Sequence, residues 1–267
     1  MTDGPACPAL VWRTHAIGDD ASVQDWASLS EPDVARTASF TNPAAMTRFV
    51  ATRALLRAAV VQLRPDLTHT TVAFAVTPTG RLEVVGHPDL AVSSSHTRAF
   101  AAAAVAADGP VGIDVEPLRR GPLPRPAAWL TPSELDDLAH LEARAAHEQD
   151  LHRLMLLHLW VAKEAALKAW PGPGSTTRKR IRILCEQERR GETTAAEPAP
   201  ADASWCGAGA AVVEPADPPP DPARRPQRAA AVPAALRLDI GWYAVDDAYL
   251  VALAHRHQAT GAATSRR

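Results

Sequence analysis

The stretch Val111-Gly-Ile-Asp-Val-Glu116 ends in alternating apolar and acidic side chains, the pattern of a short β-strand. Residues two apart in a strand point to the same face, so Asp114 and Glu116 share one side, with Cβ atoms about 7 Å apart. Ile113 and Val115 take the other face and are expected in the core. Two neighbouring carboxylates repel each other, and a hard cation such as Mg²⁺ or Ca²⁺ relieves that cost. A solvated strand face at a sheet edge is the simple alternative.

A second stretch, Leu159-Trp-Val-Ala-Lys-Glu-Ala-Ala-Leu-Lys168, is predicted to be helical. Helical spacing puts Trp160, Glu164 and Lys168 on one stripe, with Lys163 beside it. A surface ion pair between Glu164 and Lys168 would explain two of these residues. The bulky Trp160, however, indicates that this face meets another element. A third carboxylate beside the acidic strand would suit an oxygen-coordinated cation and leave two ammonium groups for a phosphate.

Two further groups of residues have the chemistry to bind an anion. The segment Ala91-Val-Ser-Ser-Ser-His-Thr97 offers hydroxyls and an imidazole, although a plain Ser-rich turn explains it too. A nucleophilic serine is disfavoured because the chain has no G-x-S-x-G motif. The second group consists of four arginines, Arg48, Arg53, Arg57 and Arg81. Their side chains could clamp a phosphate or simply be solvated. The basic run 178–182 could attract an acidic partner or form a solvated strand edge.

The order of predicted elements favours a mixed α+β fold, because strands and helices do not alternate strictly. The second helix opens at Thr131-Pro-Ser-Glu134, which has the pattern of a capping box. We expect residues 192–233 to be a flexible Pro/Ala-rich insertion, because they hold nine of the 24 prolines and show no apolar period. The expected helices are 44–63, 131–147 and 150–169, and the expected strands are 9–17, 71–76, 81–85, 100–105, 111–115, 181–185 and a hairpin over 241–255.

Composition excludes several classes of protein. The 267 residues carry a formal net charge of −2, without the basic excess of a general nucleic-acid binder. Three scattered cysteines without a C-x-x-C pair predict neither a disulfide framework nor a zinc knuckle. No apolar run reaches the roughly 18 residues of a membrane span, and the first residues lack the features of a signal peptide. We therefore expect a soluble cytoplasmic protein without a membrane or nucleic-acid partner.

Taken together and in order, these motifs resemble the surfactin-type 4'-phosphopantetheinyl transferase family. The resemblance rests on Gly80-Arg81, Ser95-His96-Thr97, Val111-Gly-Ile-Asp-Val-Glu116 and Trp160-Val-Ala-Lys-Glu-Ala-Ala-Leu-Lys168, and it covers roughly residues 9–185 and 236–255. The family forms are G-K-P, S-H-S, (V/I)-G-(V/I)-D-(V/I)-E and W-x-x-K-E-x-x-x-K. This chain departs from them where Leu82 replaces the proline of G-K-P, and in its long Pro/Ala-rich insertion.

The resemblance implies a fold and a set of site residues. The fold would be a pseudo-dimer of two similar α+β halves, 1–112 and 113–258, followed by a tail at 259–267, with coenzyme A between the halves. Mg²⁺ would be held by Asp114, Glu116 and Glu164. Glu164 would also be the general base, directly or through water. Lys168, His96 and Ser95 are expected to contact the diphosphate of coenzyme A, and Lys163 is expected to lie close by. Arg53 and Arg81 are expected to contact the 3'-phosphate end.

The implied reaction moves the 4'-phosphopantetheine group of coenzyme A onto a serine of an apo acyl or peptidyl carrier protein. Adenosine 3',5'-bisphosphate would be released, and Mg²⁺ would be required. A Mg²⁺-dependent phosphohydrolase that acts on a diphosphate is the alternative enzyme, and a non-catalytic binding protein is a third possibility. A pseudo-dimer needs no second chain to complete its cleft, so we expect a monomer.

Overall fold

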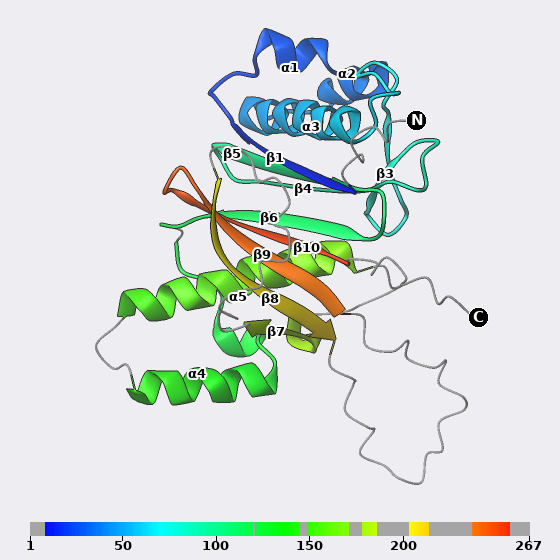
Figure 1. The fold of residues 1–267 in the computed structure, drawn as a ribbon. Coiled ribbons are helices and arrows are strands. Elements are labelled where there is room, and N and C mark those ends of the chain that lie inside the picture. Colours follow the sequence, from blue (N-terminus) through cyan, green and yellow to red (C-terminus); the bar gives the residue numbers. More distant parts are fainter. Residues whose placement is uncertain are drawn as a thin grey trace, which may run out of the picture.

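The computed structural model describes residues 9–119, 121–144, 149–170, 178–185, 203–213 and 237–256. Their strands form two five-stranded antiparallel sheets, and helices lie on the outer face of each sheet (Figure 1). The mixed α+β fold predicted from the sequence is confirmed. The first sheet has the order β1 (Leu10–Ala16), β5 (Phe100–Ala106), β4 (Ala91–His96), β3 (Leu82–Val84), β2 (Phe74–Val76), and the second has the order β6 (Val111–Pro117), β10 (Tyr249–His255), β9 (Arg237–Val245), β8 (Ala203–Val213), β7 (Ile181–Cys185).

Helix α3 (Pro43–Leu63) covers the outer face of the first sheet. It begins one residue before the predicted start. The Asn42 side chain accepts hydrogen bonds from the backbone N–H groups of Ala44 and Ala45, and Pro43 needs no such partner. Its apolar side chains pack on Ala101, Ala103 and Val105 of β5. Two short helices, α1 (Val23–Ala27) and α2 (Glu31–Thr37), precede it.

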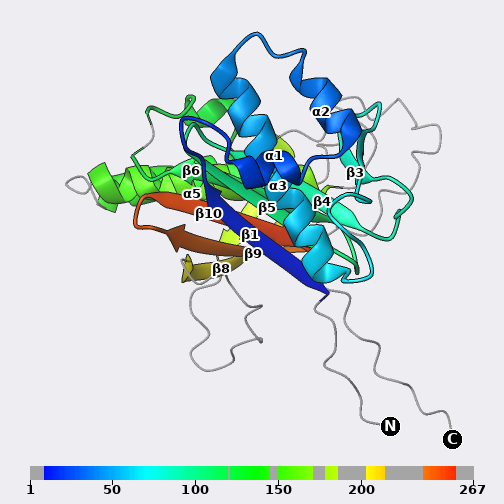
Figure 2. The same ribbon diagram turned by 90° about the horizontal axis from the view of Figure 1, so that it is seen from above.

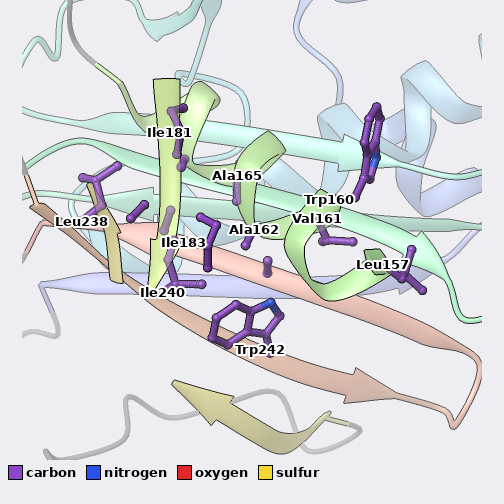
Figure 3. Packing of buried hydrophobic residues seen from close by; sticks show 14 of the residues in the cluster. Leu157, Trp160, Val161, Ala162, Ala165, Ile181, Ile183, Leu238, Ile240 and Trp242 are labelled. Atoms are coloured by element: carbon purple, nitrogen blue, oxygen red, sulfur yellow. The ribbon is translucent and has the colours of Figure 1, made fainter. Parts of the chain in front are cut away.

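Helix α5 (Gln149–Ala169) covers the outer face of the second sheet, and α4 (Pro132–Arg144) lies outside it. Figure 3 shows the α5 side chains Val161, Ala162 and Ala165 among residues of β7 and β9. The predicted capping box of α4 is present. The Thr131 N–H donates to Glu134 at 2.8 Å, and the Glu134 N–H donates to the Thr131 hydroxyl at 3.2 Å.

The molecule therefore has four layers, in the order α3, first sheet, second sheet, α5 (Figures 1 and 2). The core between the sheets contains Trp12 of β1, which lies 4.5 Å from Tyr243 of β9 between ring centroids. Ile113 and Val115 belong to the same inter-sheet core, as predicted. Because those two residues face the other sheet, Asp114 and Glu116 face α5.

The two sheets have the same topology. In each, one strand is followed by a long helix and then by four strands, and the last of these pairs with the first. Each long helix also carries a fully buried cation, Arg57 in α3 and Lys163 in α5. Arg57 binds Asp33 and Lys163 binds Glu134, and each acid is the third residue of the preceding helix. The two halves are thus alike in strand order and in this internal ion pair.

Three parts of the chain differ from the sequence predictions. Helices α1 and α2 lie in a polar stretch where no element was expected. The Ser-rich segment is strand β4 rather than a turn. Strand β8 lies inside 192–233, a segment that was expected to be flexible. Its Ala- and Gly-rich backbone forms a strand because it pairs with β7 on one side and β9 on the other. The rest of 192–233 and the tail 259–267 lie outside the described residues.

The sheets divide the described chain before Val111, so all of β6 belongs to the second sheet. Within the described segments, none of the helices has the length and apolar character needed to cross a membrane.

We predict that Gly112→Ala destabilises the protein by at least about 3 kcal/mol. A Cβ atom there would overlap the carbonyl oxygen of Ala165 and lie 2.6 Å from the backbone nitrogen of Ala169, and neither backbone can move aside cheaply. Urea unfolding measures the change. Gly121→Ala is the control, because a Cβ there meets nothing within 4 Å. Equal midpoints for the two variants would contradict the close helix–sheet contact.

Candidate functional site

A cleft of about 930 Å³ lies where the two halves meet. Its walls come from α3, the turn before β3, β4, the start of β6 and the end of α5. Among the described residues that line it, Glu83 is the single acidic one, so positive side chains outnumber negative ones in its wall. The basic and imidazole side chains that line it are Arg48, Arg53, Arg81, His96 and Lys168.

Lys168 is fixed at the cleft wall by three oxygen acceptors of the other elements. Its ammonium donates to Asp114 Oδ1 at 2.8 Å, to the Ile113 carbonyl at 3.0 Å and to the Ser94 carbonyl at 3.3 Å. Ser95, which is not one of the lining residues, also donates to Asp114 Oδ1 at 2.7 Å. Asp114 Oδ2 is buried and has no hydrogen-bond partner among the described residues. One oxygen of this carboxylate is therefore saturated and the other can still accept.

The α5 stripe predicted from the sequence lies over the acidic face of β6. Trp160 donates from its indole nitrogen to Glu116 at 3.2 Å, and Lys168, two turns later, binds Asp114. Glu164 belongs to the turn between them. The prediction that this face of the helix meets another element is confirmed.

The carboxylate of Glu164 is engaged by Arg178, the first residue of a 3₁₀ turn at Arg178–Arg180. The same guanidinium lies over the Trp160 ring, with 4.9 Å between its central carbon and the ring centroid. In the part of the chain that the structure describes, no three His, Cys, Asp or Glu residues are grouped so that they could hold a metal ion. Asp114, Glu116 and Glu164 therefore do not form the expected three-carboxylate site as they are arranged here.

Lys163, which was expected to lie close to the diphosphate, is not among the residues that line the cleft. Its side chain is fully buried and forms an ion pair with Glu134. It also donates to the carbonyls of Trp129 at 3.2 Å and Arg178 at 3.0 Å. Glu134 in turn accepts the N–H of Ile183 at 2.9 Å. Helical spacing places Lys163 next to the stripe of Trp160, Glu164 and Lys168. The face of α5 that carries Lys163, however, packs on α4 and β7.

Arg53 and Arg81 both line the cleft. Arg53 is oriented by Asp33, 3.4 Å away, and lies between the rings of Phe49 and Phe74. Arg81 donates to the backbone carbonyl of Lys168 at 3.4 Å and so links the two halves. Burial lowers the pKa of both guanidinium groups, and the Asp33 charge partly offsets this for Arg53. These desolvated positive charges favour an anionic ligand.

His96 ends β4 and lines the same cleft. Burial lowers the pKa of its imidazole below the usual value, and the charges of Arg48 and Lys168 lower it further. The ring is therefore mostly neutral at pH 7 and can donate one hydrogen bond and accept another.

Sequence reasoning missed two residues of the site. Asp33, which anchors Arg53, was part of an unassigned polar stretch, although Ser30-Glu-Pro-Asp33 has the same spacing as the capping box at Thr131. Arg178 was noticed only as part of a basic run. Arg57, considered for a phosphate clamp, is instead buried against Asp33.

Comparison with known proteins agrees with this geometry. Residues 110–212 match the family model ACPS, described as the 4'-phosphopantetheinyl transferase superfamily. The match spans less than half of the chain. It contains both acidic residues of β6 and the α5 stripe of Trp160, Glu164 and Lys168. A search of curated proteins found no match. Over this segment the chain is similar to the superfamily, and the match supports a phosphopantetheinyl transferase in general.

We predict that Lys163→Ala lowers the free energy of unfolding by about 3–5 kcal/mol, because it leaves the buried carboxylate of Glu134 without its ion-pair partner. Urea unfolding measures this, with the exposed Lys179→Ala as the control, which should stay within about 0.5 kcal/mol of the parent chain. If Lys163 acted on a ligand instead, the variant would keep its stability.

We predict that Arg48→Ala raises the pKa of His96, because the Arg48 charge disfavours the imidazolium. A pH titration of the imidazole signals by NMR measures this. Arg36→Ala is the control, since that exposed arginine does not contribute to the His96 shift. A pKa that does not move in Arg48→Ala would show that the two groups are not coupled.

Proposed function

We propose that the protein transfers the 4'-phosphopantetheine group of coenzyme A to a serine hydroxyl of an apo acyl or peptidyl carrier protein and releases adenosine 3',5'-bisphosphate. The observation that carries the proposal is the basic cleft between the two halves, with Lys168 fixed at its wall by Asp114. The superfamily match over residues 110–212 supports the same class of reaction.

The distribution of charge in the cleft suits a coenzyme with a diphosphate and a separate 3'-phosphate. Arg53 and Arg81, from the first half, are proposed to bind the 3'-phosphate end. His96 is proposed to bind the diphosphate, and Lys168, whose ammonium already donates to three oxygens of the wall, is proposed to attract it through its charge. The Ser95–Asp114 hydrogen bond helps to keep Lys168 in place. Each half supplies part of the wall, so one chain completes the cleft and we propose that it acts as a monomer in the cytoplasm.

In the proposed reaction the carrier serine oxygen attacks the β-phosphorus of the diphosphate. The bond between that phosphorus and the bridging oxygen breaks, and adenosine 3',5'-bisphosphate leaves. Lys168 stabilises the negative charge that grows on the phosphate oxygens, and a neutral His96 donates a hydrogen bond to them. Glu164 is proposed to accept the serine proton, directly or through water, once its carboxylate is released from Arg178. Magnesium dependence, which the resemblance implies, stays a prediction, and no step is assigned to the metal.

We predict that intact-mass measurement of an apo carrier, incubated with coenzyme A, Mg²⁺ and this protein, gains the mass of one phosphopantetheine group. Lys168→Ala should slow this transfer by about 100-fold or more, because it removes the cation that meets the reacting phosphate. Asp114→Ala should do the same, because Lys168 loses its fixed position. Lys179→Ala, a change of an exposed lysine, is the matched control.

The phosphohydrolase alternative is separated by omitting the carrier. A hydrolase would cleave coenzyme A on its own, whereas a transferase leaves it intact until a carrier serine is present. Cleavage without carrier, or full transfer by Lys168→Ala, would contradict the proposed function.

A further inference from the structure

We propose that Arg178 is a positioning residue that acts as the internal counter-ion of Glu164, and that a divalent cation must displace it to recruit Glu164 to the acidic face of β6. The inference rests on the proposed function, since it concerns the same three carboxylates. It explains why these carboxylates are not assembled here.

The first step is the location of Glu164. It lies on α5 one turn after Trp160 and one turn before Lys168, and the side chains of those two residues contact Glu116 and Asp114. The helix backbone therefore already holds Glu164 over the acidic face of β6. Its carboxylate is instead paired with Arg178.

The second step is the need of Glu164 for a positive partner. Its side chain is 19% exposed, so most of its hydration is lost and an unpaired charge would be costly. Arg178 supplies the charge, and its guanidinium also lies over the Trp160 ring. A competing cation could supply this positive charge in place of the guanidinium.

The third step is that Arg178 can leave without disturbing the fold. Its backbone is fixed, because its carbonyl accepts a hydrogen bond from the buried Lys163 at 3.0 Å. Its side chain, in contrast, is 40% exposed and can turn into solvent. A fixed backbone with a movable charged end makes Arg178 a reversible partner for Glu164.

The fourth step concerns the other two acids. Asp114 Oδ2 is buried and lacks a hydrogen-bond partner, so it is a ready acceptor. Glu116 lies on the same strand face, although its carboxylate already accepts the Trp160 indole N–H. A hard cation between these oxygens would gain a third carboxylate if Glu164 exchanged Arg178 for it.

The test is the affinity of the full chain for Mn²⁺ alone, measured by electron paramagnetic resonance without coenzyme A or carrier. We expect Arg178→Gln to lower the Kd about fivefold, because the cation no longer competes with a partly exposed ion pair and its aromatic contact. The effect should vanish in the background of Glu164→Gln, where no carboxylate is released.

Arg182→Gln is the matched control. Arg182 lies on the neighbouring β7, is 35% exposed and pairs with Asp137 at 3.5 Å. Its substitution therefore removes one nearby positive charge without changing the ion pair of Glu164. Its Kd should change less than about twofold, because exposed charges at a distance are screened. Thermal unfolding checks that each variant is folded.

Equal Mn²⁺ affinities for Arg178→Gln and Arg182→Gln would overturn the proposal. The same gain from Arg178→Gln with and without Glu164 would also overturn it, as would a lack of Mn²⁺ binding in all variants. Transfer to a carrier is measured separately, so a protein that binds Mn²⁺ as expected but fails to transfer would contradict the proposed function and leave this inference standing.

Discussion

Close contact between α5 and β6 at Gly112 determines the geometry of the candidate site. The absence of a side chain lets the backbone of α5 approach the strand at Ala165 and Ala169. Lys168 can then reach Asp114 and two carbonyls of the strands below, while Trp160 reaches Glu116. With a larger residue in place of Gly112 the helix would stand farther from the strand, and these polar contacts would be lost together.

The internal duplication clarifies what is specific to the second half. By strand register, Arg13 of β1 is equivalent to Asp114 of β6, because each is the fourth residue of a first strand that pairs with the last. Arg13 binds Gln62 of α3 at 3.0 Å, just as Asp114 binds Lys168 of α5. The first half thus keeps the strand-to-helix contact but lacks the carboxylate, and its contribution to the cleft comes instead from its arginines.

Much of this arrangement could be predicted from the sequence, and the exceptions have physical reasons. Helices α3 and α4 have strong start signals at Asn42 and Thr131, and their first residues follow closely. Strand β4 was missed because Ser93 and Ser95 look like turn residues, whereas their hydroxyls bond to the neighbouring β6, at Ile113 N–H and Asp114. Strand β8 was missed because Ala and Gly show no period, and pairing with both neighbours decides its structure.

The site itself was predictable only in part. The stripe of α5 follows from helical spacing, but the pairing of Glu164 with Arg178 joins two elements and leaves no periodic signal. Lys163 and Lys168 share a feature that spacing also cannot reveal: in each, one nitrogen donates to three oxygens that converge on it. A compact ammonium can satisfy three acceptors from one point, whereas a flat guanidinium spreads its donors over a fork. The chain has 25 arginines and 3 lysines. At positions 163 and 168, replacing lysine by arginine is therefore not a conservative substitution.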